Sequence, residues 1–128
     1  MTYVDTSVVL AWVLREPIRP PPEFWGPHLA TSRLTEYEAW VRLHSYGRAA
    51  ADGGALRTTL LSLNTVELDV AACARCFSPF PVPVRTLDAL HLAAADHLRA
   101  QGVSVDIATY DTRMCDAARA LGFSMALS

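Results

Sequence analysis

The sequence predicts an α/β fold, a three-layer α/β/α sandwich around a central, mostly parallel sheet. Short β-prone runs alternate with helical segments along the whole chain, a pattern typical of parallel sheets that carry helices on both faces. The length of 128 residues is that of one ordinary domain. We therefore expect residues 1–128 to form a single domain, with two proline-rich stretches as loops inside it.

The first part of the chain is expected to supply two strands and two helices. Residues 2–4 are β-prone, and the apolar stretch over residues 8–14 has the length of a helix. Residues 17–27 contain five prolines and must be irregular, because proline cannot propagate a helix or a central strand. A short strand is expected over 29–31, and a serine suited to an N-cap then precedes a helix expected over 33–50.

In the middle of the chain, glycines and prolines set the expected boundaries. The glycine pair at 53–54 predicts a turn, and the apolar residues 55–63 then predict a short helix. A strand is expected over 65–68 and a helix over 69–77. The prolines within 79–83 predict an extended connection.

The last part of the chain is expected to alternate helix and strand twice. A threonine suited to an N-cap opens a helix expected over 86–101, and Gly102 ends it. A strand is then expected over 104–108, a helix over 111–121 and a final strand over 124–127. The helix over 86–101 is expected to bury one apolar stripe, made of Leu87, Leu90, Ala94 and Leu98.

The composition excludes several classes of protein. Hydrophobic residues make up 52% of the chain and charged residues 19%, which is typical of a folded domain and not of a disordered one. No apolar run approaches the roughly 20 residues of a membrane span, and the first residues do not resemble a signal peptide, so we expect a cytoplasmic protein. All eleven basic residues are arginines, which excludes mechanisms that need a catalytic or phosphate-binding lysine.

Two aspartates follow β-prone runs and precede helices. Asp5 follows the first predicted strand, and Asp111 follows the strand predicted over 104–108. In open α/β sheets the carboxyl ends of the strands form the edge where ligands bind. Each aspartate also suits a helix N-cap, so neither residue indicates a site by itself.

Glu38 is expected to lie on a buried helical face. It falls between residues of an apparent apolar stripe, whereas Glu36 points to the opposite side as a surface charge. A carboxylate that faces a core is unfavourable unless it is paired or bound to a metal. The expected stripe is made of Leu34, Tyr37, Val41 and His44.

Asp88 completes a set of four carboxylates. It lies in the first turn of its predicted helix, where a capping or dipole role is the alternative. Carboxylates at two strand ends, on a buried helical face and at a helix start can converge on one cleft. Oxygen ligands are what Mg²⁺ or Mn²⁺ prefers, and carboxylates so close together repel one another without a cation.

Four short motifs resemble, in order and spacing, those of PIN domains. The closest resemblance is to the VapC-type ribonuclease toxins of bacterial type II toxin–antitoxin pairs, and it extends over nearly the whole chain. The motifs are residues 4–7 (VDTS), 32–38 (SRLTEYE), 87–95 (LDALHLAAA) and 108–111 (ATYD).

The resemblance implies a set of site residues. The acidic quartet, as catalytic residues and metal ligands, would be Asp5, Glu38, Asp88 and Asp111. Ser7 and Thr109 resemble the family's supporting hydroxyl residues. Asp106 is an additional candidate, although it lies at the start of its predicted strand, away from the proposed edge, and His91 is expected to be packed or hydrogen-bonded. Candidate phosphate contacts, each of which is otherwise an ordinary surface charge, are Arg15, Arg33, Arg42, Arg85 and Arg113.

The resemblance further implies an activity and its partners. The chain would be a single PIN-like nuclease domain over 1–128, an endoribonuclease that uses Mg²⁺, with Mn²⁺ as a possible substitute, to hydrolyse RNA phosphodiester bonds. As a toxin it would inhibit growth or translation. Its partners would be an RNA substrate, a cognate antitoxin protein and a second copy in a homodimer, with no membrane.

The main alternative is a catalytically silent module. Such a protein would keep the fold and the carboxylates but act by binding RNA or another protein. An aspartyl phosphotransferase is disfavoured, because Ser7 stands where its second aspartate is needed and the chain has no lysine. A serine hydrolase is disfavoured by the lack of a G-x-S-x-G motif.

Overall fold

The computed structural model describes residues 1–127, which contain a five-stranded parallel sheet of order β3-β2-β1-β4-β5. The central strand β1 pairs in parallel with β2 on one side and β4 on the other. The predicted fold class is confirmed, and the sheet is parallel throughout. The strands are β1 (Thr2–Val4), β2 (Leu29–Ser32), β3 (Asn64–Val66), β4 (Asp106–Ala108) and β5 (Ser124–Met125).

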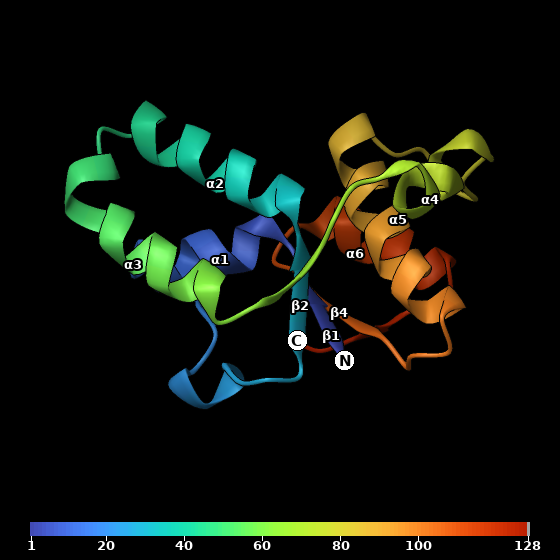
Figure 1. The fold of residues 1–128 in the computed structure, drawn as a ribbon, viewed down its shortest axis with the longest axis horizontal. Coiled ribbons are helices and arrows are strands. Elements are labelled where there is room, and N and C mark those ends of the chain that lie inside the picture. The colour runs from blue at the N-terminus through green and yellow to red at the C-terminus, as the bar shows by residue number, and fades with distance from the viewer. Residues whose placement is uncertain (128) are drawn as a thin grey trace.

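Helices cover both faces of the sheet, and the two groups separate clearly in Figure 1. One face carries α1 (Thr6–Val13), α2 (Arg33–Ser45) and α3 (Ala49–Leu61). The other carries α4 (Val70–Cys73), α5 (Thr86–Ala100) and α6 (Thr112–Ala120). Short 3₁₀ helices lie at Pro22–Phe24 and Ala74–Phe77. No helix within residues 1–127 has the length and apolar character needed to cross a membrane.

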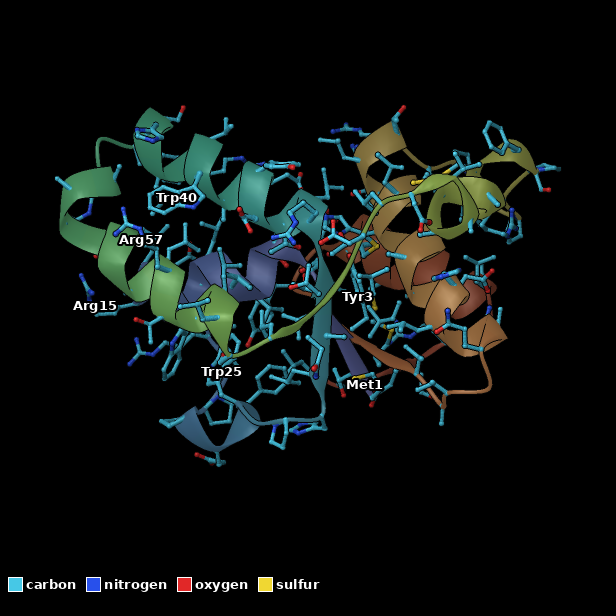
Figure 2. All side chains as sticks on the ribbon, in the orientation of Figure 1. Met1, Tyr3, Arg15, Trp25, Trp40 and Arg57 are labelled. Atoms are coloured by element: carbon cyan, nitrogen blue, oxygen red, sulfur yellow. The ribbon has the colours of Figure 1, made fainter. Side chains whose placement is uncertain are left out.

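The central strand divides the interior into two apolar cores. Successive side chains of a strand point to opposite faces, so Tyr3 packs among residues of α5 and α6, whereas Val4 packs among residues of α1, α2 and α3. In Figure 2, Tyr3 lies near the strands and Trp40 lies between α2 and α3. Tyr3 and Val4 of β1 are almost completely buried, at 1% and 0% exposed, which fixes the position of the segment that follows the strand.

The expected turn at the glycine pair is wrong. Gly53 and Gly54 lie inside α3, and the helix predicted over 33–50 ends at Ser45. The chain reverses instead at Gly47, whose φ of +67° is readily adopted only by glycine. A Cβ at Gly53 would lie 3.0 Å from the Trp40 ring, so this glycine allows α3 to approach α2 closely.

The expected buried stripe of α5 is also wrong in part. Leu87 is 48% exposed, and Leu90 and Leu98 are only partly buried. Arg85, not Thr86, occupies the N-cap position. Because α5 is covered by α4 and the sheet on a broad face, its buried residues are Ala89 together with the continuous run His91–Ala95.

Candidate active site

Two of the candidate carboxylates lie at the carboxyl edge of the sheet. Asp5 directly follows β1, and Asp111 follows the neighbouring strand β4. Both are also helix N-caps: Asp5 Oδ1 accepts from the backbone N–H of Ser7 at 3.1 Å, and Asp111 Oδ1 accepts from that of Arg113 at 2.9 Å. Each aspartate therefore both caps a helix and lies at the edge of the sheet where ligands bind in such folds.

Asp5 is held on both carboxylate oxygens by hydroxyl groups. The Ser7 hydroxyl donates to Oδ1 at 2.6 Å, and the Thr109 hydroxyl donates to Oδ2 at 2.6 Å. Asp5 is only 5% exposed. Burial raises the pKa of Asp5 above its usual value, although the two hydroxyls act in the opposite direction. No arginine contributes a hydrogen bond to this carboxylate among residues 1–127.

Glu38 lies on α2, and its oxygen Oε1 accepts two hydrogen bonds. The Thr6 hydroxyl donates at 2.7 Å, and His91 Nε2 lies at 2.6 Å. Burial alone would raise the pKa of Glu38, but the hydrogen bonds from His91 and Thr6 outweigh it and hold the pKa below its usual value. These hydrogen bonds therefore favour the ionised form of the carboxylate.

The reasoning that selected Glu38 was wrong in its details. Tyr37 and Val41 are 59% and 67% exposed, so they do not form a buried stripe with Leu34. A helix that packs on α1, α3 and the sheet edge turns a different face inward, and its buried members are Leu34, Thr35, Ala39 and Leu43. Glu38 lies at the border of that face, where it is 18% exposed.

Three of the carboxylates meet at one cavity of about 480 Å³. Glu38 comes from α2, Asp88 from the first turn of α5, and Asp111 from the N-cap of α6. Burial raises the pKa of Asp88, and the negative charge of Asp111 raises it further. Asp5 does not line this cavity, but its neighbour Thr6 binds Glu38. The lining residues are Glu38, Arg42, Arg85, Thr86, Leu87, Asp88, Asp111 and Arg113.

The candidate arginines fall into two groups. Arg42, Arg85 and Arg113 line the cavity with the carboxylates. Arg15 instead pairs with Asp52 at 3.4 Å, and Arg33 pairs with Glu36 at 2.8 Å and also with Glu67. The structure therefore brings three of the five arginines to the site. The additional candidate Asp106 does not lie there. It is at the opposite end of β4, where its Oδ1 accepts a hydrogen bond from the Thr2 hydroxyl at 2.6 Å.

The donor set has the chemistry of a divalent-cation site. Carboxylate oxygens are the ligands that Mg²⁺ and Mn²⁺ prefer, and the raised pKa of Asp88, caused by burial and then by Asp111, indicates a charge repulsion that a cation would relieve. Among residues 1–127, however, no three His, Cys, Asp or Glu side chains lie close enough to hold a metal ion as they stand. Binding would therefore require side chains such as Asp88 and Asp111 to move closer together.

The sequence profile of the PIN domain matches residues 2–120, a span that includes all four carboxylates. The chain belongs to the PIN-domain family. It is 33% identical to Ribonuclease VapC46 of Mycobacterium tuberculosis, over 96% of this chain and 94% of that protein. It is 29% identical to Ribonuclease VapC47 of the same species, over 96% and 93%.

The PIN fold also recurs among solved structures. A chain of a toxin–antitoxin complex from Klebsiella pneumoniae superposes with a TM-score of 0.61, at 20% identity and over 88% of each chain. At that level of identity the likeness shows the fold alone. It is consistent with the parallel sheet and the two helical layers described above.

Sequence reasoning missed two residues that hold this PIN-domain site together. Thr6 lies within the first motif and contacts Glu38, and Tyr3 directly precedes the motif and contacts His91. His91 was expected to be packed or hydrogen-bonded, but its contact with Glu38 was not foreseen. Its position three residues after Asp88 was the available signal, because residues i and i+3 share one face of a helix.

Proposed function

We propose that this chain is a single-domain, divalent-metal-dependent endoribonuclease that acts as the toxin of a toxin–antitoxin pair. The observation that carries the proposal is the meeting of Glu38, Asp88 and Asp111 with three arginines at one cavity. The similarity to two VapC ribonucleases, over nearly the full length of both chains, supports the same activity.

The four carboxylates share one role in this proposal. Asp5, Glu38, Asp88 and Asp111 would hold Mg²⁺, or Mn²⁺ in its place. The bound ion would supply an activated water and stabilise negative charge on the phosphate. Because a preorganised ligand loses less freedom on binding, the hydrogen bonds that fix Asp5 and Glu38 favour metal binding.

Ser7 and Thr109 would support Asp5. Each donates a hydrogen bond of 2.6 Å to one of its oxygens. Partners of this kind orient a ligand and set its basicity, and their removal weakens metal binding or activity by roughly 10–100-fold in comparable sites.

The RNA strand would approach through the arginines. Arg42, Arg85 and Arg113 stand beside the carboxylates and can bind phosphate oxygens in a bidentate manner. Arg42 also lines an adjoining cavity of about 390 Å³, which contains Tyr46 and Tyr110. Aromatic side chains stack on unpaired bases, so we infer that the substrate is single-stranded or looped RNA.

Two protein partners belong to the proposal. These are a cognate antitoxin and a second copy of this chain. A toxin that cuts cellular RNA would act in the cytoplasm. Tyr37 and Val41 support a protein contact on the outer face of α2, because they are large apolar side chains exposed by 59% and 67%. Tyr46, 55% exposed, lies just beyond the end of the same helix.

The proposal is tested by incubating purified protein, freed of any antitoxin, with total bacterial RNA. Reactions with Mg²⁺ or Mn²⁺ are compared with reactions in EDTA and with Asp5→Asn, Asp88→Asn and Glu38→Gln. The matched control is Glu36→Gln, on the same helix, because Glu36 pairs with Arg33 outside the cavity. We expect discrete fragments that require the metal and Glu38 but not Glu36.

Two outcomes would contradict this proposal. Cleavage that persists in EDTA would exclude the metal-dependent mechanism. Tight RNA binding without cleavage, by folded protein supplied with metal, would favour the silent binding module.

A further inference from the structure

A buried chain of hydrogen bonds ends on Glu38. His91 Nε2 lies 2.6 Å from Oε1 of Glu38, the same oxygen that accepts from Thr6. On the other side of the imidazole, Nδ1 lies 2.8 Å from the Tyr3 hydroxyl. That hydroxyl in turn donates to Oγ of Ser32 at 2.9 Å. This series of hydrogen bonds therefore links Ser32 at the end of β2, through Tyr3 of β1 and His91 of α5, to the Glu38 carboxylate on α2.

The residues that form this series of hydrogen bonds are shielded from water. His91 is 4% exposed, and Tyr3 and Ser32 are each 1% exposed. Figure 2 shows Tyr3 near the strands, in the interior of the molecule. Burial raises the pKa of the Tyr3 phenol, so it remains a neutral hydroxyl. Because buried polar groups are unfavourable when they lose a partner, each member holds the next in place.

The two carboxylate oxygens of Glu38 differ in their hydrogen bonds. Oε1 accepts from Thr6 and has His91 Nε2 within hydrogen-bond distance, whereas the hydrogen bonds within residues 1–127 leave Oε2 without a partner. Glu38 also lines the cavity that contains Asp88 and Asp111. A carboxylate with one oxygen fixed and one oxygen unused is suited to bind a cation through the second oxygen.

We propose that His91, held by Tyr3, is a positioning residue for Glu38. It fixes Oε1 and so orients Oε2 for a divalent cation, without touching the cation or the RNA. This inference rests on the proposed function, because it assigns a role within the same site. Thr6 donates to the same oxygen at 2.7 Å, so His91 provides a second contact that fixes Oε1 from the side of α5.

The test measures binding of Mn²⁺ alone by titration calorimetry, using the full chain freed of antitoxin. His91→Leu removes the contacts of the imidazole with Glu38, Tyr3 and Thr6, whereas His91→Gln places an amide N–H near the position of Nε2. We expect His91→Leu to weaken Mn²⁺ binding by about 10–100-fold, the range for partners that orient a ligand. We expect His91→Gln to recover most of that loss.

A structural role would give a different pattern. It would lower the Tm of both His91 variants but leave the Mn²⁺ affinity of the folded protein unchanged. Tyr3→Phe provides a second variant if His91→Leu does not fold, because it keeps the imidazole and the apolar ring and removes only the hydroxyl, with its contacts to Nδ1 and to Ser32. We expect Tyr3→Phe to weaken Mn²⁺ binding by a smaller factor than His91→Leu and to lower kcat at fixed Mn²⁺ more than it raises KM for RNA.

The outcomes separate this inference from the proposed function. If the wild-type protein binds Mn²⁺ and cuts RNA, and Tyr3→Phe and every folded His91 variant do so equally well, His91 is not a positioning residue. If the wild-type protein neither binds Mn²⁺ nor cuts RNA, the proposed function fails and this inference fails with it.

Discussion

Two buried aspartates in this molecule, Asp52 and Asp5, differ in the groups that surround their carboxylates. Asp52 on α3 is 2% exposed and pairs with Arg48 at 2.9 Å and Arg15 at 3.4 Å. Asp5 is 5% exposed but receives only hydroxyl and backbone hydrogen bonds. The hydrogen bond from Arg48 holds the pKa of Asp52 below its usual value, whereas burial raises that of Asp5.

The difference indicates what each carboxylate is for. At Asp52 the protein supplies the compensating positive charge itself: Arg48 lies at the N-cap of α3, and Arg15 follows the end of α1. At Asp5 the hydrogen bonds come from hydroxyl and backbone groups and not from an arginine, and under the proposed function a cation from solution would compensate the charge. Buried charges that lack a protein partner are unfavourable unless they bind a metal or serve a site. The predictions below test this contrast.

The largest effect is expected on RNA cleavage. Asp5→Asn and Asp88→Asn should lower kcat/KM by about 1000-fold or more, the scale of losing a catalytic group. Asp52→Asn should leave kcat/KM of the folded protein within a few-fold of wild type. This prediction is checked by cleavage rates measured with a defined RNA at saturating Mn²⁺. Equal losses of kcat/KM for Asp52→Asn and Asp88→Asn would contradict the proposed difference between Asp52 and the site aspartates.

The hydroxyls that hold Asp5 should have the next largest effect. Thr109→Val keeps the shape of the side chain but removes the donor to Oδ2, so cleavage should fall by about 10–100-fold. Thr109→Ser keeps the donor and should retain most of the activity. If Thr109→Val cleaves as fast as wild type, the hydroxyl does not contribute to the site.

The two aspartates should shift stability with pH in opposite directions. The folded pKa of Asp52 is lowered, so its contribution is fully present above the unfolded pKa of about 4 and is lost as the pH falls through the lower folded value. The folded pKa of Asp5 is raised, so it destabilises the metal-free protein as the pH rises from about 4 through the folded value.

The two variants should therefore differ in Tm at pH 7. In EDTA, Asp5→Asn should raise the Tm and Asp52→Asn should lower it, as measured by thermal unfolding. Near pH 3, where the aspartates are largely protonated in the unfolded chain, both differences should shrink. A lower Tm for both variants at pH 7 would mean that Asp5 is as well compensated as Asp52.

The smallest effect concerns the helix that carries Asp52. Gly54→Ala adds a Cβ that meets nothing within 4 Å and should stabilise α3 by about 0.5–1 kcal/mol. Gly53→Ala should lose that gain, because its Cβ would lie 3.0 Å from the Trp40 ring. Urea unfolding of the two variants measures the difference, and equal stabilisation would show that the contact of α3 with α2 can relax.

Much of the fold could be predicted because its signals are local. The segments before Asp5 and Asp111 form strands, and both aspartates cap the helices that follow. The turn at Gly47 could not be predicted, because a helix tolerates glycine wherever packing compensates for it. At Gly53 the compensation is the close approach of Trp40, a tertiary contact that no local pattern contains.

The candidate site could be predicted in composition but not in its connections. Glu38, Asp88 and Asp111 line one cavity, whereas Asp5, which was expected to converge with them, does not. The sequence did not indicate that Arg15 is engaged by Asp52 and Arg33 by Glu36. Which arginine is free depends on carboxylates brought near by the fold, and Asp52 is 37 residues from Arg15 along the chain.

The central claim is that the site carboxylates bind a cation from solution, whereas Asp52 does not. It is tested most directly by the rate of RNA cleavage against Mn²⁺ concentration for wild type, Asp52→Asn and Asp88→Asn. We predict that wild type and Asp52→Asn saturate at similar Mn²⁺ concentrations and that Asp88→Asn stays near the background rate. Cleavage that does not depend on Mn²⁺, or an Asp88→Asn curve that matches wild type, would contradict the account.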